Sequence, residues 1–204
     1  GAPGPWSSGI NSDGFALADT HVSTADHGPG IHRYFLMNRL LAECATVREA
    51  IALILSLPHC GGGNLVLADA SGTTAAVELR HRRVDFSVGS WSARTNHFTG
   101  LPDPLSAVGH SLRRLETLMA AIAARKASPS AWLRIHEPEA ICRHVEIHGG
   151  SPTLSASVYD TRARTAEIAL GQPCTTPPQV FRIGSDGWEE VGLPVAETHG
   201  TAMH

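Results

Sequence analysis

The segment Arg94-Thr95-Asn96-His97-Phe98 brings a hydroxyl, a carboxamide and an imidazole together at the end of a strand-like run. An asparagine N–H can stabilise the oxyanion of an acyl-transfer intermediate, and removing such a donor costs about 3 kcal/mol in known cases. An asparagine is also common in turns, where its side chain caps the next segment. Composition alone favours the turn. If this segment takes part in chemistry instead, Asn96 is the candidate oxyanion donor.

Arg143 is a second candidate for chemistry, because it stands among apolar residues in a stretch that we predict to be a short helix over 139–145. A guanidinium binds a carboxylate through two parallel hydrogen bonds. The partner of Arg143 is either a carboxylate on a substrate or a structural acid such as Glu139 or Glu146. The sequence leaves both alternatives open.

Histidine is abundant, with 12 residues in the chain. His144 and His148 lie one helical turn apart, with Glu146 between them and Cys142 nearby. A zinc site needs three or four such ligands, and the chain contains neither an HExxH nor a CxxC pattern. We therefore interpret these histidines as scattered surface residues and predict no metal and no other cofactor.

Two further patterns are better explained by structure than by chemistry. Gly61-Gly62-Gly63 precedes a strand-like run, whereas a phosphate-binding glycine loop opens a helix. We predict a turn at this position. The Gly-x-Ser-x-Gly elbow of serine hydrolases is absent from the sequence.

The elements that must position these residues are predicted from apolar periodicity and turn residues. Thr46 and Glu49 form a capping box at the start of the second helix. The predicted helices cover 31–44, a segment from 46 to about 57, 104–125 and 139–145. The predicted strands cover 6–10, 15–22, 64–70, 75–79, 84–88, 91–98, 154–159, 165–170, 179–183 and 188–191. Antiparallel groups of strands with two blocks of helices between them indicate an α+β fold.

Composition limits the classes of function. The chain has 204 residues, 42% hydrophobic and 17% charged, with a formal net charge of -3. These values exclude a strongly basic nucleic-acid binder and a chain that is disordered over most of its length. No apolar run is long enough to span a bilayer, so we expect no membrane partner. The four cysteines show no tight pairing pattern, which favours free thiols and a cytoplasmic location. We predict one domain over 1–192 and a loose tail over 193–204.

Several segments, taken in order, resemble the penicillin acyltransferase-like cysteine amidohydrolases, a family that includes acyl-coenzyme A:6-aminopenicillanic acid acyltransferase. The resemblance covers about Gly4 to Pro173, and the order and spacing of the segments carry it. The matching segments are Gly9–Ser23, Gly30–Arg33, Glu49–Ile51, Asn64–Gly72 with Val77-Glu78, Arg94–Phe98, Ser111–Arg114 and Ile141–Arg143.

The resemblance implies a four-layer αββα N-terminal nucleophile hydrolase fold that lacks its first strands. It places Asn96 at the oxyanion-stabilising asparagine of the family and Arg143 at a functionally important arginine. His110 precedes Ser111 at a position where relatives often have Asp, and the resemblance assigns a supporting role to that position. In the family a precursor cuts itself and exposes an N-terminal cysteine, whose own α-amine acts as the base.

The nucleophile is the main departure from the family pattern. The chain begins at Gly1, and none of its four cysteines stands in the family's nucleophile context. We therefore expect the nucleophilic cysteine to lie outside these residues, either in a longer protein or on a second chain that acts as a partner. A catalytically inactive relative is the remaining alternative.

The sequence thus predicts an amidohydrolase or acyltransferase that acts on amide or thioester bonds of a small acylated amine or peptide-derived metabolite, through a cysteine acyl-enzyme. The alternative is a non-catalytic binding or assembly subunit that keeps the fold. The expected partners are a small-molecule acyl substrate and the chain that carries the nucleophile, with no nucleic acid and no membrane.

Overall fold

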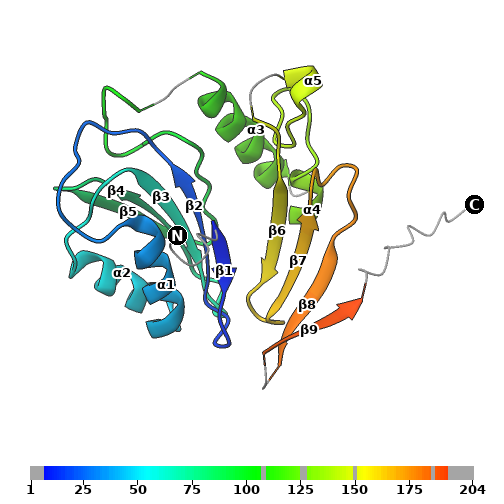
Figure 1. The fold of residues 1–204 in the computed structure, drawn as a ribbon, viewed down its shortest axis with the longest axis horizontal. Helices are drawn as coiled ribbons and strands as arrows, with labels where there is room; N and C mark the ends of the chain where they lie inside the picture. Colours follow the sequence, from blue (N-terminus) through cyan, green and yellow to red (C-terminus); the bar gives the residue numbers. More distant parts are fainter. Residues whose placement is uncertain (1–6, 107–108, 125–127, 149–150, 185–186, 193–204) are drawn as a thin grey trace, which may run out of the picture.

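A computed structural model of the chain describes residues 7–106, 109–124, 128–148, 151–184 and 187–192. The described residues form two antiparallel sheets (Figure 1). The first sheet has the order β1 (Ser8–Ile10), β2 (Ala16–His21), β3 (Gly63–Ala68), β4 (Thr74–Leu79) and β5 (Val84–Gly89). The second has the order β6 (Ser155–Asp160), β7 (Thr165–Leu170), β8 (Gln179–Gly184) and β9 (Gly187–Gly192). The helices are α1 (Arg33–Glu43), α2 (Val47–Leu55), α3 (His110–Ala124), α4 (Pro129–Trp132) and α5 (Val145–His148).

Helices α1 and α2 cover one face of the first sheet and enclose the main core. Alternate side chains of a strand point to opposite faces. Leu65 and Leu67 of β3 therefore share one face with Val77 of β4, and all three are buried against the two helices. The helices contribute Leu36, Met37, Leu40, Val47, Ala50 and Ile54 to this core.

Local polar contacts hold the two helices in place. The predicted capping box is confirmed, since Glu49 N donates to Thr46 Oγ1 and Thr46 N donates to the Glu49 carboxylate. Asn11, in the turn between β1 and β2, donates from Nδ2 to the carbonyls of Leu41 and Cys44 at the end of α1. The hairpin turn and the helix end are therefore stabilised by one side chain.

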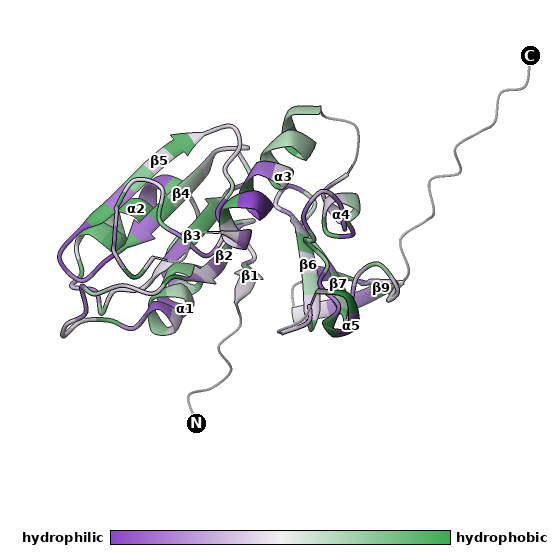
Figure 2. Cartoon of the chain, turned by 90° about the horizontal axis from the view of Figure 1, so that it is seen from above, coloured by the Kyte–Doolittle hydropathy of each residue, from purple (hydrophilic) through white to green (hydrophobic). Residues whose placement is uncertain are grey.

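The two sheets meet at their edges. Ser8 Oγ of β1 lies 3.0 Å from Ser157 Oγ and 2.9 Å from Tyr159 OH, both on β6. Thr161, in the turn after β6, donates from Oγ1 to the carbonyl of Asp69, in the turn after β3, at 3.2 Å. Helix α3 lies between the first sheet and α4 in both views (Figures 1 and 2). It is therefore placed to link the two halves of the molecule.

Most predicted elements are confirmed, and two are wrong. Residues 91–98 form no strand, because the carbonyls of Thr95 and His97 accept hydrogen bonds from the Asn64 side chain instead of from a neighbouring strand. Residues 139–144 form no helix, because Ile141 N and Cys142 N both donate to the carbonyl of Ile135, and α5 begins only at Val145. Arg143 therefore lies in an irregular loop, paired through its backbone with Thr153.

The long predicted helix begins at His110, and residues 101–106 before it are irregular. The tail predicted over 193–204 lies outside the described residues. So do residues 107–108 of the predicted helix and residues 185–186 of the last predicted turn. The single domain predicted over 1–192 stays a prediction.

Candidate active site

A row of polar side chains crosses the first sheet on the face opposite α1 and α2. Thr20 of β2 pairs with Asn64 of β3, which pairs with Glu78 of β4. Because paired residues of neighbouring strands share a face, these three side chains point the same way. Asn64 and Glu78 are fully buried. Something polar must therefore cover this face, since buried polar groups need partners.

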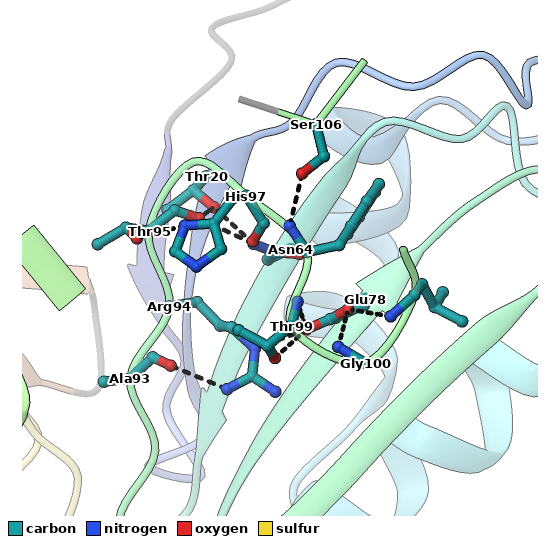
Figure 3. Close-up of polar contacts among 12 residues, drawn as sticks. Thr20, Asn64, Glu78, Ala93, Arg94, Thr95, His97, Thr99, Gly100 and Ser106 are labelled. Carbon is teal, nitrogen blue, oxygen red and sulfur yellow. Dashed lines mark hydrogen bonds and ion pairs between the residues drawn. The ribbon is translucent and has the colours of Figure 1, made fainter. Parts of the chain in front are cut away.

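The cover is the loop over residues 93–101, which Asn64 fastens at its centre (Figure 3). Asn64 Nδ2 donates to the carbonyl of Thr95 at 2.9 Å and to that of His97 at 3.0 Å. Thr20 Oγ1 also donates to the Thr95 carbonyl, at 2.8 Å. The backbone is thus held on both sides of Asn96.

Glu78 fastens the second half of the loop (Figure 3). Its carboxylate accepts from the backbone N–H groups of Thr99, Gly100 and Leu101 and from Thr99 Oγ1, and it forms an ion pair with Arg94 at 3.1 Å. Burial by itself favours the neutral acid, but the hydrogen bonds from Thr99, Gly100 and Leu101 outweigh it and lower the pKa of Glu78. Glu78 is therefore a structural anion with a full set of partners.

Asn96 lies at the middle of this loop, half-buried, with a defined side-chain orientation. Its Nδ2 donates to the His21 carbonyl at the end of β2, at 2.9 Å, and its Oδ1 accepts from Arg114 Nη2 of α3, at 2.6 Å. An arginine can only donate and a carbonyl can only accept, so these two partners fix which end of the carboxamide carries the hydrogens. Among the described residues, the second N–H of Nδ2 has no acceptor. It can therefore donate to a ligand.

His97 and Ser111 connect the loop to helix α3 below Asn96. His97 Nδ1 lies 2.9 Å from Ser111 Oγ, and Thr95 Oγ1 donates to the Ser111 carbonyl at 2.8 Å. Burial lowers the pKa of His97, and the charges of Arg94 and Arg114 lower it further against the opposing effect of Glu78. His97 is thus favoured in its neutral form inside the site.

The structure brings the three candidate site residues of the sequence into one neighbourhood, on and beside α3. Asn96 is bonded to Arg114. Burial lowers the pKa of Arg114, and the nearby charge of Arg143 lowers it further. Burial together with the charges of Arg114 and Arg143 also lowers the pKa of His110, the first residue of α3. The neighbourhood is therefore electropositive, with Glu139 as its acidic member.

Glu139, one of the two predicted acidic partners of Arg143, is engaged by Arg113 at 2.8 Å. The hydrogen bond from Arg113 lowers the pKa of Glu139, to which the charge of Arg143 also contributes. Two arginines thus share this carboxylate electrostatically. An anionic group on a substrate would find additional positive charge here.

The glycine run is a turn, as predicted. Gly61 and Gly62 have φ of +93° and +92°, and a Cβ at Gly63 would lie 2.5 Å from Arg33 Nη1. Arg33 is itself buried and paired with Asp19 at 2.5 Å. The glycines therefore make room for a buried ion pair next to the start of β3.

Sequence analysis missed the residues that hold the loop, Asn64, Glu78 and Arg114. A signal was present for two of them, because Asn64 and Glu78 interrupt apolar strand runs. It also missed that His136, Cys142, His144 and Cys174 gather into one cluster of possible metal ligands. His144 and Cys142 had been considered together with His148, whereas His136 and Cys174 are distant in sequence.

Comparisons with known proteins identify the family of the chain. The family model described as acyl-coenzyme A:6-aminopenicillanic acid acyl-transferase matches residues 6–175. No curated protein matches the chain at a significant level. Among the described residues, no helix is long and apolar enough to cross a membrane.

Solved structures share the fold. Penicillin V acylase from Agrobacterium tumefaciens superposes with a TM-score of 0.56 at 17% identity, covering 91% of this chain and 66% of that one. A mutant of conjugated bile acid hydrolase from Clostridium perfringens superposes with a TM-score of 0.52 at 13% identity, covering 81% of this chain and 69% of that one. The α+β, N-terminal nucleophile hydrolase fold predicted from the sequence is confirmed. The chain spans slightly less than two thirds of the penicillin V acylase.

Proposed function

Because the chain belongs to the acyl-coenzyme A:6-aminopenicillanic acid acyl-transferase family, we propose that it supplies the oxyanion-binding part of a cysteine amidohydrolase or acyltransferase. The substrate is an amide or thioester of a small acylated amine or peptide-derived metabolite. The observation that carries the proposal is the side chain of Asn96, oriented by His21 and Arg114 and left with one N–H for a ligand.

The chemistry follows from that donor. The cysteine's own α-amine takes the thiol proton, and the resulting thiolate attacks the substrate carbonyl. The carbonyl oxygen becomes an oxyanion, which accepts the second N–H of Asn96. When the C–N or C–S bond breaks, the ammonium returns the proton to the leaving amine or thiol. Water or an acceptor amine then releases the acyl group from the cysteine.

Two features of the described residues support a nucleophile supplied by a segment outside the chain. β1 pairs on one side with β2 and has no strand partner on its other side among the described residues. Next to it lies a mostly apolar cavity of about 420 Å³ between the two sheets, lined by residues that include Ile10, Leu41, Ile168 and Trp188. A strand added at this edge would pair with β1 and fill the cavity, which removes an unpaired edge and exposed apolar surface.

Arg143 and His110 belong to the same proposal as substrate-binding or supporting residues. Arg143 contributes to the electropositive neighbourhood of Arg114 that borders Asn96. Burial and the same charges lower the pKa of His110, so its imidazole is favoured in the neutral form and can serve as a hydrogen-bonding group. A carboxylate on the substrate would lie favourably against this group of charges.

The test is Asn96→Ala in the complete protein that carries the upstream cysteine, assayed on a panel of N-acylated amines and acyl thioesters. We expect kcat to fall about 10²- to 10³-fold, while the thermal midpoint stays close to that of the parent. Unchanged turnover of Asn96→Ala would remove this residue from its role. A complete parent protein that cleaves no member of the panel would favour the non-catalytic subunit instead.

A further inference from the structure

Four potential metal ligands lie close together, and two of them flank Arg143 in the sequence. The ligand atoms of His136, Cys142, His144 and Cys174, one from each residue, all lie within 4.8 Å of one another. Three of the residues come from the loop between α4 and α5, and Cys174 comes from the turn that follows β7. Cys142 is fully buried and the other three are half-buried.

The distances among three of these atoms are close to the edges of one coordination tetrahedron. Cys142 Sγ lies 3.4 Å from Cys174 Sγ and 3.8 Å from His144 Nε2, and His144 Nε2 lies 3.1 Å from Cys174 Sγ. Zinc bonds of about 2.3 Å to sulfur and about 2.0–2.1 Å to nitrogen place tetrahedral ligands about 3.3–3.8 Å apart. The rings of His136 and His144 are also close, with centroids 5.3 Å apart. The ligand atom of His136 lies within 4.8 Å of the other three, so it can complete the set by side-chain rotation.

The ligand chemistry selects the kind of metal. Two thiolates and two imidazoles at tetrahedral spacing suit Zn²⁺, whereas Mg²⁺ and Ca²⁺ require oxygen ligands. Binding releases the protons of both thiols, so the two thiolate charges balance the charge of the ion. A neutral centre is compatible with the burial of Cys142.

We propose that His136, Cys142, His144 and Cys174 bind one structural Zn²⁺ ion. Four protein ligands complete the coordination, and a closed site of this kind has a structural role rather than a catalytic one. The ion would tie the loop over 136–144 to the turn at Cys174. Since Arg143 lies between two of the ligands, the same ion would hold its backbone in position beside Arg114.

Metal content tests the site directly. Protein purified under reducing conditions, without added metal, is expected to contain one zinc per chain by inductively coupled plasma mass spectrometry. Cys174→Ser should reduce the zinc content at least tenfold. Cys60→Ser is the matched control, because Cys60 is a free, half-buried cysteine outside the cluster, and it should keep the full content. Equal zinc in both variants would overturn the proposal.

A second measurement uses the unaltered protein, in case Cys174→Ser does not fold. Chelation followed by titration with Co²⁺ should produce the visible bands of tetrahedral cobalt and a thiolate charge-transfer band, both saturating at one ion per chain and lost on adding Zn²⁺. The absence of both bands in folded, reduced protein would overturn the site. A Cys142–Cys174 disulfide in metal-free protein would also overturn the site, if its reduction by a strong reductant leaves the thermal midpoint unchanged. Mass spectrometry of the alkylated protein identifies the disulfide.

Discussion

At the scale of single residues, the site depends on buried polar groups that find many of their partners in one loop, residues 93–101. Glu78 has no exposed surface, yet it accepts hydrogen bonds from three consecutive backbone N–H groups and pairs with Arg94. Removing one partner of such a buried group leaves the others unsatisfied, which costs more than the net value of the hydrogen bonds. The position of Asn96 therefore depends on buried side chains elsewhere in the sheet, such as Glu78 and Asn64.

Glu78→Gln should destabilise the protein by about 2–4 kcal/mol. The NH₂ group of the new amide would face backbone N–H donors that need an acceptor, and the negative charge that pairs with Arg94 would be lost. Chemical denaturation at neutral pH measures this loss of stability. Glu116→Gln, on the exposed side of α3, is the control and should change the free energy of unfolding by less than about 0.5 kcal/mol.

The stability of the parent should also depend on pH through Glu78. Because its folded-state pKa lies below the ordinary value of 4.5, Glu78 contributes full stability above that value and loses it as the pH falls through the folded pKa. The stability difference between the parent and Glu78→Gln should therefore shrink below about pH 4.5. A difference that is constant down to pH 2 would contradict this assignment.

Arg143→Lys keeps the charge but loses the planar fork. In the complete enzyme we expect kcat/KM to fall about tenfold or more, with a thermal midpoint near that of the parent. Arg39→Lys, an exposed arginine paired with Glu43 on α1, should leave kcat/KM unchanged. A collapse of the midpoint with normal activity in the remaining folded protein would show that Arg143 is structural.

At the scale of elements, contacts between turns join the two sheets. The turn at Gly14 packs against the β6–β7 hairpin, where a Cβ would meet the Thr161 carbonyl at 2.2 Å. Gly14 also has a φ of +80°, which side chains rarely adopt. The glycine is therefore required both by its backbone conformation and by its contact with the second sheet.

Gly14→Ala and Gly72→Ala separate these two requirements. Both glycines have positive φ, but at Gly72 the nearest atom to a new Cβ is Arg162 Nη2 at 3.4 Å. We expect Gly72→Ala to cost about 1 kcal/mol from backbone strain alone. Gly14→Ala should cost about 1–3 kcal/mol more, from the clash with Thr161. Equal losses in denaturant titrations would mean that this contact contributes nothing.

At the scale of the whole molecule, the core is unevenly distributed. The first sheet and its two helices bury nearly all the large apolar side chains, whereas the only buried apolar residues described in the second sheet are Ala166 and Ala169. Leu170 is 71% exposed and Trp188 49% exposed, and Trp188 lines the cavity beside β1. A sheet with so little buried apolar area needs further cover to be stable.

Hydrogen exchange tests whether such cover includes a strand paired with β1 at the edge of the first sheet. In the 204-residue chain alone, we expect the outward-facing amides of β1 to exchange rapidly, because they have no strand partner among the described residues. In the complete protein the same amides should be protected at least tenfold more strongly, while the central amides of β3 change little. Identical exchange of β1 in both proteins would contradict the proposal that a further strand pairs with it.

The amino-acid sequence was sufficient for features that depend on local order. The capping box at Thr46, the hairpin turns and the strands β3 and β4 arise from residues close together in the chain, so apolar patterning and turn chemistry predict them. The family resemblance likewise depends on the order of segments.

Features that depend on contacts between distant segments required the three-dimensional structure. Residues 91–98 looked like a strand because their own pattern does not show that Asn64 binds the carbonyls of Thr95 and His97, or that Glu78 binds the backbone N–H groups that follow from Thr99 on. Residues 139–145 looked helical because apolar periodicity does not show the hydrogen bonds that residues 141–143 make to Ile135 and Thr153. The cluster of two cysteines and two histidines was missed because Cys174 is 30 residues from His144, and tertiary folding alone brings it within ligand distance.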